Sequence, residues 1–95
     1  MKTETQKISY YAILEKGETG LGVIFPDVPG CISYGDDIED AKIMGTEALS
    51  LHFDDFDSAT DILPPKLWNG SIETIPNEFS NINIADIVLI SIQLP

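Results

Sequence analysis

The residues with the most reactive side chains in this 95-residue sequence are its single cysteine, Cys31, and its single histidine, His52. A thiol and an imidazole can form a nucleophile–base pair. Such a pair also needs an orienting group and an oxyanion site, and the sequence shows no motif for either. His52 falls on the apolar stripe of a predicted helix, so we interpret both side chains as core residues and predict no catalytic residue.

The sixteen acidic residues suggest a second kind of chemistry, a two-metal nuclease site. Such a site needs carboxylates that converge from separate elements on metal ions about 4 Å apart. In this sequence the acidic residues gather at the two ends of the predicted helix, and the interiors of the predicted strands contain no acidic residue. We therefore predict no metal site, no cofactor and no enzymatic activity, and keep a residual metal-dependent nuclease as the third of three hypotheses. The residues at the two helix ends are Asp36, Asp37, Glu39 and Asp40, and Asp54, Asp55 and Asp57.

The five basic residues leave the chain with a formal net charge of −11. Such a surface repels nucleic-acid phosphates and anionic membranes, because binding to either depends on Lys and Arg side chains. We expect neither as a direct partner. The same field attracts basic proteins and accelerates their association at low salt. The alternative is that the acidity serves only solubility, and composition alone leaves both interpretations open.

Length and composition predict one globular domain that spans residues 1–95. The apolar fraction of 43% and the charged fraction of 22% are ordinary for a folded domain and argue against intrinsic disorder. A single cysteine rules out an intramolecular disulfide. The polar N-terminus does not resemble a signal peptide, and no apolar run approaches the length of a membrane span. We therefore expect a cytoplasmic protein.

Hydrophobic periodicity predicts an α+β domain with two layers, in the order β-β-β-α-β. The first strand is apolar on both faces, which indicates cover on more than one side. Asp37 is the predicted N-cap of the helix. Gly45 inside that helix indicates a close approach to the sheet, which we expect to be mostly antiparallel with the helix on one face. The first three predicted strands cover residues 8–15, 21–25 and 31–34. The predicted helix covers residues 37–56, the long loop residues 58–85 and the final strand residues 86–94.

A resemblance to a known family rests on the residues that lead from the second strand into the helix. Residues 25–31 read Phe-Pro-Asp-Val-Pro-Gly-Cys, and Gly35 and Asp36 precede the acidic helix start. Residues 47–52 and 62–65, Glu-Ala-Leu-Ser-Leu-His and Ile-Leu-Pro-Pro, fit the same pattern. The chain resembles the N-terminal domain of HicB-like antitoxins over residues 8–65, and more loosely in the final strand.

The resemblance implies a partly degraded ribonuclease H-like fold that lacks catalytic activity. It also implies a partner, a basic HicA-like mRNA interferase toxin with a catalytic histidine, which the domain would neutralise by occluding the toxin's active site. This agrees with the net charge of −11. The alternative is a non-enzymatic acidic regulatory or scaffold domain of the same fold that binds another protein, and a homo-oligomer is left open.

HicB-like antitoxins usually continue into a ribbon-helix-helix or helix-turn-helix segment that binds operator DNA. We recognise no such DNA-binding segment after the final strand, so the chain is expected to be either a natural minimal form or a truncated one. We predict that the toxin contacts the turn at residues 26–30 and the start of the helix. Both features also have a structural alternative, because Pro and Gly shape turns and Asp caps helices. The candidate toxin-binding residues are Asp27, Pro29, Asp36, Asp37, Glu39 and Asp40.

Overall fold

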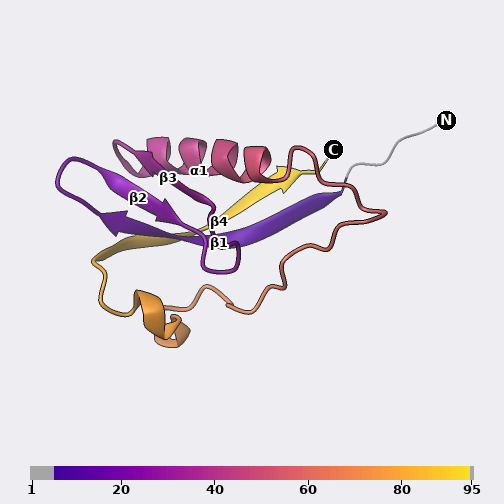
Figure 1. The fold of residues 1–95 in the computed structure, drawn as a ribbon. Helices are drawn as coiled ribbons and strands as arrows, with labels where there is room; N and C mark the ends of the chain where they lie inside the picture. The colour runs from indigo at the N-terminus through magenta and orange to yellow at the C-terminus, as the bar shows by residue number, and fades with distance from the viewer. Residues whose placement is uncertain (1–5, 95) are drawn as a thin grey trace.

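The computed structural model describes residues 6–94 as a four-stranded antiparallel sheet with one main helix on one face (Figure 1). The strand order is β3-β2-β1-β4, so the final strand pairs with the first strand at one side of the sheet. The predicted α+β architecture is confirmed. The elements are β1 (Lys7–Lys16), β2 (Leu21–Ile24), β3 (Ile32–Gly35), α1 (Ile38–His52), two short 3-10 helices, η1 (Ile72–Thr74) and η2 (Asn77–Phe79), and β4 (Ile84–Gln93).

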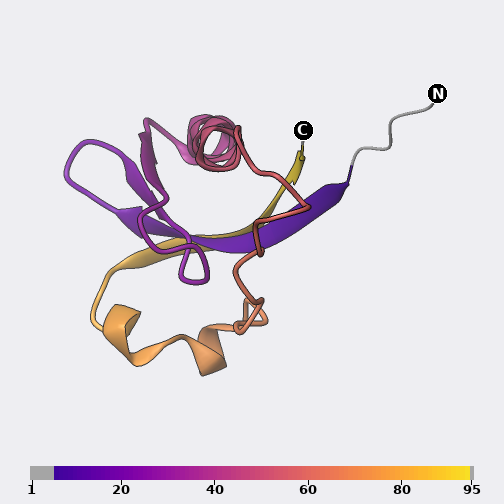
Figure 2. The same ribbon diagram turned by 45° about the vertical axis from the view of Figure 1, so that its right-hand side comes forward.

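Strand β1 is covered on both faces, as its two apolar faces predicted. Tyr10 and Ala12 lie in the core beneath α1, with 2% and 0% of their surface exposed, and Ile13 on the opposite face is also fully buried. The second cover is the segment 58–83, which runs from the end of α1 to the start of β4. Its first part, as far as Leu63 and Pro64, still contacts the core beneath α1, and the segment then crosses to the face of the sheet opposite α1 (Figures 1 and 2). We call this segment the strap.

Helix α1 packs on the sheet through residues spaced four apart. Ala41, Gly45 and Leu49 are buried, and Phe53 continues the row beyond the last helical turn. A Cβ atom on Gly45 would lie 2.8 Å from Ile90 Cδ1 and 3.0 Å from Val23 Cγ1. Both distances are shorter than normal van der Waals contact, so the close helix–sheet approach predicted from Gly45 is confirmed.

The predicted burial of His52 is wrong, because this side chain is exposed at the end of α1. The buried row follows the spacing 41, 45, 49 and 53, and His52 lies about 100° around the helix axis from Phe53. The His52 ring meets the edge of the Phe53 ring, with centroids 4.9 Å apart. Phe53 also stacks on Tyr10, with centroids 6.3 Å apart. The aromatic contact to the core thus comes from Phe53.

The element boundaries differ from the prediction by a few residues. Helix α1 ends at His52, earlier than the predicted fraying near Phe56, and Phe53 caps it through a bond to the Leu49 carbonyl. Strand β3 begins one residue after the buried Cys31, and β4 begins at Ile84 instead of 86. Among residues 6–94, no helix is long and apolar enough to cross a membrane.

Candidate functional site

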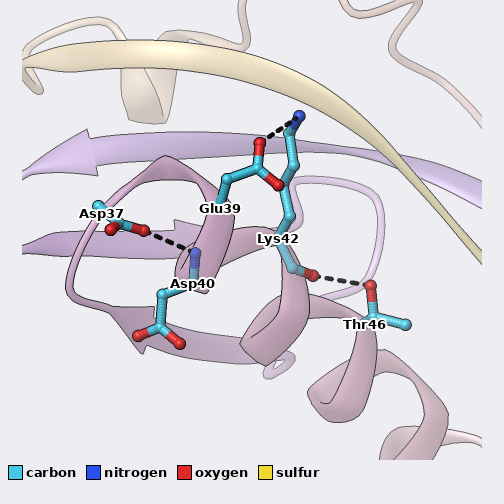
Figure 3. Close-up of polar contacts among 5 residues, drawn as sticks. All are labelled: Asp37, Glu39, Asp40, Lys42 and Thr46. Atoms are coloured by element: carbon cyan, nitrogen blue, oxygen red, sulfur yellow. Dashed lines mark hydrogen bonds and ion pairs between the residues drawn. The ribbon is translucent and has the colours of Figure 1, made fainter.

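Four carboxylates gather at the start of α1, and we call Asp36, Asp37, Glu39 and Asp40 the helix-start patch. Asp37 Oδ1 accepts a hydrogen bond from the Asp40 backbone N–H at 2.8 Å (Figure 3). In return, Asp40 Oδ2 accepts the Asp36 backbone N–H at 2.9 Å. This reciprocal arrangement satisfies backbone donors at the helix start, in the manner of a capping box. The predicted N-cap role of Asp37 is confirmed.

The helix-start patch keeps most of its negative charge. Among residues 6–94 its one ion pair joins Glu39 Oε2 to Lys42 Nζ at 3.7 Å, and the two side chains are 83% and 46% exposed (Figure 3). An ion pair this exposed contributes little, because water screens it. Asp36, Asp37 and Glu39 are exposed residues. The patch therefore presents uncompensated carboxylates to solvent and can attract a cationic surface.

The turn at residues 26–30 reverses the chain between β2 and β3. The Val28 N–H donates to the Phe25 carbonyl at 3.0 Å, and the Cys31 N–H donates to the Val28 carbonyl at 3.1 Å. Val28 is fully buried, whereas Pro29 is exposed at the tip. Gly30 has a φ of +88°, which L-residues adopt only with strain. The turn thus has a structural role of its own and leaves Pro29 accessible.

Asp27 holds the strap against the turn. Its Oδ2 atom accepts the backbone N–H groups of Leu67 at 2.9 Å and Trp68 at 3.0 Å. Trp68 is 6% exposed and meets the Tyr11 ring edge-on, with centroids 6.1 Å apart. Trp68 thus pins the long loop to the body of the domain. No local sequence pattern indicated Asp27 as its partner, because the bond spans 41 residues.

A second bond ties the strap to the end of β1 that lacks β2 as a neighbour. The Tyr10 hydroxyl donates to the Pro64 carbonyl at 2.7 Å. Burial of the hydroxyl raises its pKa above the usual value, and the charge of Asp27 adds to the effect. The hydroxyl therefore stays protonated and keeps its role as a donor. The Lys66 ammonium lies 5.6 Å from the centre of the same ring.

A groove lies between the turn and the strap. One hollow of about 450 Å³ is lined by Asp27 on the turn and by Leu67 and Trp68 on the strap. Pro26 and Phe79 line this hollow and also a second, adjoining hollow of about 230 Å³. The second hollow reaches Pro29 and the exposed Ile32. Glu78 lines both hollows. The groove combines apolar walls with carboxylates, a composition that suits an apolar side chain next to a basic one.

The candidate toxin-binding residues thus fall into two groups. The helix-start patch is brought together by its own hydrogen bonds, whereas Asp27 and Pro29 border the groove on the turn. No hydrogen bond or ion pair joins the two groups within the described part of the chain. The strap residues that complete the groove, Leu67 and Trp68, were not among the candidates.

Cys31 and His52 are not placed for joint chemistry. Cys31 is 3% exposed, and burial raises the pKa of its thiol to about 11, which leaves it protonated and unreactive at neutral pH. His52 is exposed on α1. Residues 6–94 also contain no group of three or more His, Cys, Asp or Glu side chains that could hold a metal ion. The expectation of no catalytic activity stays a prediction.

The profile of a family described as the HicB-like antitoxin of bacterial toxin–antitoxin systems matches residues 10–94. The chain belongs to this family. The match runs from β1 through β4, so it includes the turn, the helix-start patch and the strap. It extends beyond the residues that carried the resemblance in the sequence.

Solved structures share the fold of this HicB-like chain at low sequence identity. The crystal structure of antitoxin HicB3 has a TM-score of 0.65 at 19% identity, covering 90% of this chain and 62% of that one. A HicA3 and HicB3 toxin–antitoxin complex has a TM-score of 0.62 at 18% identity, and the match covers 93% of this chain and 99% of that one. A toxin–antitoxin complex from Streptococcus pneumoniae has a TM-score of 0.66 at 18% identity, and the match covers 95% of this chain and 70% of that one.

A curated relative from Haemophilus phage HP1 is an uncharacterised 14.9 kDa protein, 42% identical over 45 residues. That match covers 47% of this chain and 34% of the relative. The chain therefore spans about a third of this relative's length and 62% of the length of antitoxin HicB3.

Proposed function

We propose that this chain is the antitoxin of a type II toxin–antitoxin system that binds a basic, HicA-like mRNA interferase and holds it inactive by occluding the toxin's active site. The observation that carries the proposal is the family match over residues 10–94. The net charge of −11 supports a basic partner independently of the match. The fold is also that of chains solved in toxin–antitoxin complexes.

Two surfaces are proposed to share the toxin contact. The helix-start patch supplies exposed carboxylates that steer a basic protein toward the chain, an effect on association rate more than on final affinity. The groove supplies the apolar area that a stable interface needs at its centre, with Pro29 and Leu67 exposed at its border. Asp27 serves the contact by holding the strap in place.

The test is calorimetric titration of this chain with a basic, HicA-like protein, sought among the reading frames next to its own, at low and at moderate salt. We expect saturable binding near one to one that weakens as salt rises, because ions screen the charges. An RNA-cleavage assay should then show that the basic protein cuts RNA alone and is inactive in the complex. Absence of binding at both salt concentrations contradicts the proposal and favours a scaffold domain with another partner.

Matched variants separate the helix-start patch from the overall charge. The double variant Asp36→Asn and Glu39→Gln removes two carboxylates and leaves the capping residues Asp37 and Asp40 intact. Its association rate with the toxin should fall about tenfold at low salt. The control, Asp54→Asn with Asp55→Asn, makes the same charge change beyond the other end of α1. Equal effects of the two double variants would remove the helix-start patch from the proposal.

A further inference from the structure

The strap contains all four asparagines of the chain, and only Asn69 is followed by a glycine, Gly70. Asparagine is one of the thermolabile residues, because the backbone nitrogen of the next residue can attack its side-chain amide. A glycine hinders this attack least, since it has no Cβ atom. Asn69–Gly70 is therefore the pair in this chain whose chemistry most favours loss of the amide. The other three asparagines precede Glu or Ile and are Asn77, Asn81 and Asn83.

The reaction changes the side chain of Asn69 without a cofactor. The Gly70 nitrogen forms a bond to Cγ of Asn69 and gives its proton to water. The bond from Cγ to the amide nitrogen breaks, this nitrogen takes up a proton, and ammonia leaves behind a five-membered succinimide ring. Water then opens the ring at one of its two carbonyl carbons, which gives aspartate or isoaspartate. Both products carry one negative charge more than asparagine.

Two hydrogen bonds hold the Asn69 side chain within the strap. Its Oδ1 atom accepts the Ser71 backbone N–H at 3.0 Å and the Thr74 hydroxyl at 2.8 Å. Closing the succinimide ring rotates the side chain about its Cα–Cβ bond, and this rotation carries Oδ1 away from its two donors. The hydrogen bonds therefore oppose the reaction.

The backbone of the pair is fixed on both sides as well. The Trp68 N–H donates to Asp27 Oδ2 at 3.0 Å, and a Cβ atom on Gly70 would lie 2.5 Å from Tyr11 Cδ1, so both neighbours of Asn69 are held against the body of the domain. A nearly planar ring requires Cβ of Asn69 to eclipse the Gly70 nitrogen across the Cα–C bond. This arrangement lies outside the regular backbone regions. The backbone has to rotate to reach it, and the closed strap prevents that rotation.

We propose that Asn69–Gly70 is a self-modification site, which is protected while the strap is closed and deamidates when the strap opens. Segments of a protein open locally with free energies below that of global unfolding, above all where regular secondary structure is scarce. The strap has only the two short 3-10 helices η1 and η2. The rate of deamidation in the folded chain then measures how often the strap leaves the sheet.

Isoaspartate prevents the strap from closing again. Its main chain runs through Cβ, which adds one atom between Trp68 and Gly70. Trp68 is bound to the turn and Gly70 is in close contact with Tyr11, so the longer backbone cannot satisfy both contacts. Trp68 and Asn69 also line the hollow of about 450 Å³. The modification thus makes a brief opening permanent and removes one wall of the groove.

The first measurement follows deamidation of the full chain during incubation at physiological temperature and mildly alkaline pH. Peptide mapping by mass spectrometry gives the rate at each asparagine, and the same chain in urea gives the rate without the fold. We expect only Asn69 to react, at least about tenfold more slowly in the folded chain than in urea. Equal rates in the two states contradict protection by the strap, and an intact Asn69 in urea overturns the site. The chain is measured alone, so the result is independent of the proposed toxin contact.

Two variants release the pair in different ways. Asp27→Ala removes the acceptor of the Trp68 N–H, and Thr74→Val removes one donor to Asn69 Oδ1. Each should raise the rate at Asn69 in the folded chain about threefold to tenfold and leave the rate in urea unchanged. The control, Thr60→Val, makes the same substitution at an exposed strap residue outside these contacts and should react like the parent chain. Parent-like rates for both release variants overturn the protection.

Trp68, the single tryptophan, reports whether the modified strap stays open. The isoaspartyl form, separated by chromatography, should show fluorescence at longer wavelength, because the ring leaves its buried position. Asn69→Asp is the matched control. It has the same added charge on an unmodified backbone, and its carboxylate can accept the same two hydrogen bonds, so it should keep the parent spectrum. A parent-like spectrum of the isoaspartyl form contradicts permanent opening.

Discussion

The Oδ2 atom of Asp27 accepts the backbone N–H of Trp68 at 3.0 Å and so joins the turn after β2 to the strap. The same oxygen accepts the Leu67 N–H at 2.9 Å. A carboxylate that binds two backbone donors makes stronger bonds than a neutral acceptor does. One side chain thus fixes the segment that covers the second face of the sheet and borders the groove.

Replacing Asp27 by Ala should loosen the strap. The variant leaves the N–H of the buried Trp68 without its acceptor, so we expect a loss of about 2 kcal/mol in the free energy of unfolding. Urea unfolding measures the loss, and hydrogen exchange should become faster at Leu67 and Trp68. Glu73→Ala, on an exposed strap residue, is the control and should change stability by less than about 0.5 kcal/mol. Equal stability and equal exchange in the two variants would mean that Asp27 does not hold the strap.

Gly45→Ala should destabilise the protein although Ala is the better helix former. The gain in helix propensity is about 1 kcal/mol, but the new Cβ meets Ile90 at 2.8 Å and Val23 at 3.0 Å. Overpacking of a core costs about 1–3 kcal/mol, so we expect a net loss near 1 kcal/mol in thermal or urea unfolding. Glu47→Ala on the exposed side of α1 should be neutral or slightly stabilising. A stabilised Gly45→Ala variant would contradict the close helix–sheet contact.

Gly70 and Gly30 form a matched pair for the strap and the turn. Both have a positive φ, +82° and +88°, so Ala at either position costs about 1–2 kcal/mol in backbone strain. A Cβ at Gly70 would also lie 2.5 Å from Tyr11 Cδ1, whereas a Cβ at Gly30 meets nothing within 4 Å. Gly70→Ala should therefore be the more destabilising and should shift the Trp68 fluorescence to longer wavelength. Equal losses with unchanged fluorescence would show that the strap does not press on Tyr11.

The buried thiol of Cys31 should make stability fall at alkaline pH. Its pKa is raised from 9.0 to about 11 by burial, so the unfolded chain loses this proton first as the pH rises. The folded state then binds more protons than the unfolded state, and stability decreases from about pH 9 until the thiol ionises in the folded protein near pH 11. Below pH 9 the contribution is constant.

Urea midpoints measured between pH 8 and pH 10 test this dependence. The pKa of Tyr10 is raised above its ordinary value of 10.0, so its ionisation affects the stability only at higher pH than this range. Cys31→Ala should be less stable overall, since it leaves a small cavity, but its midpoint should decline less over this interval. The native thiol should also resist iodoacetamide at pH 8. Rapid alkylation of the folded chain would contradict the raised pKa.

Local patterns in the sequence predicted the elements and much of their packing. Alternating apolar residues gave both faces of β1, the capping preference of Asp gave the start of α1, and Gly45 indicated the close approach to the sheet. The error at His52 also has a local cause. The apolar stripe that contains Ala41 and Leu49 fits either His52 or Phe53 as its next member, and only the direction of the last turn decides between them.

The sequence by itself determined the order of elements, the α+β class, the acidic character and the helix cap, because each depends on residues within a few positions of one another or on composition alone. Only the tertiary structure decided that Asp27 binds the strap 41 residues away, that Tyr10 binds Pro64, and that β4 pairs with β1 in the order β3-β2-β1-β4. Such contacts depend on how the chain closes long loops and on which side chains then meet. The free-energy cost of closing a loop changes only slowly with the number of residues in the loop. The spacing of two residues in the sequence therefore does not determine whether they will be in contact.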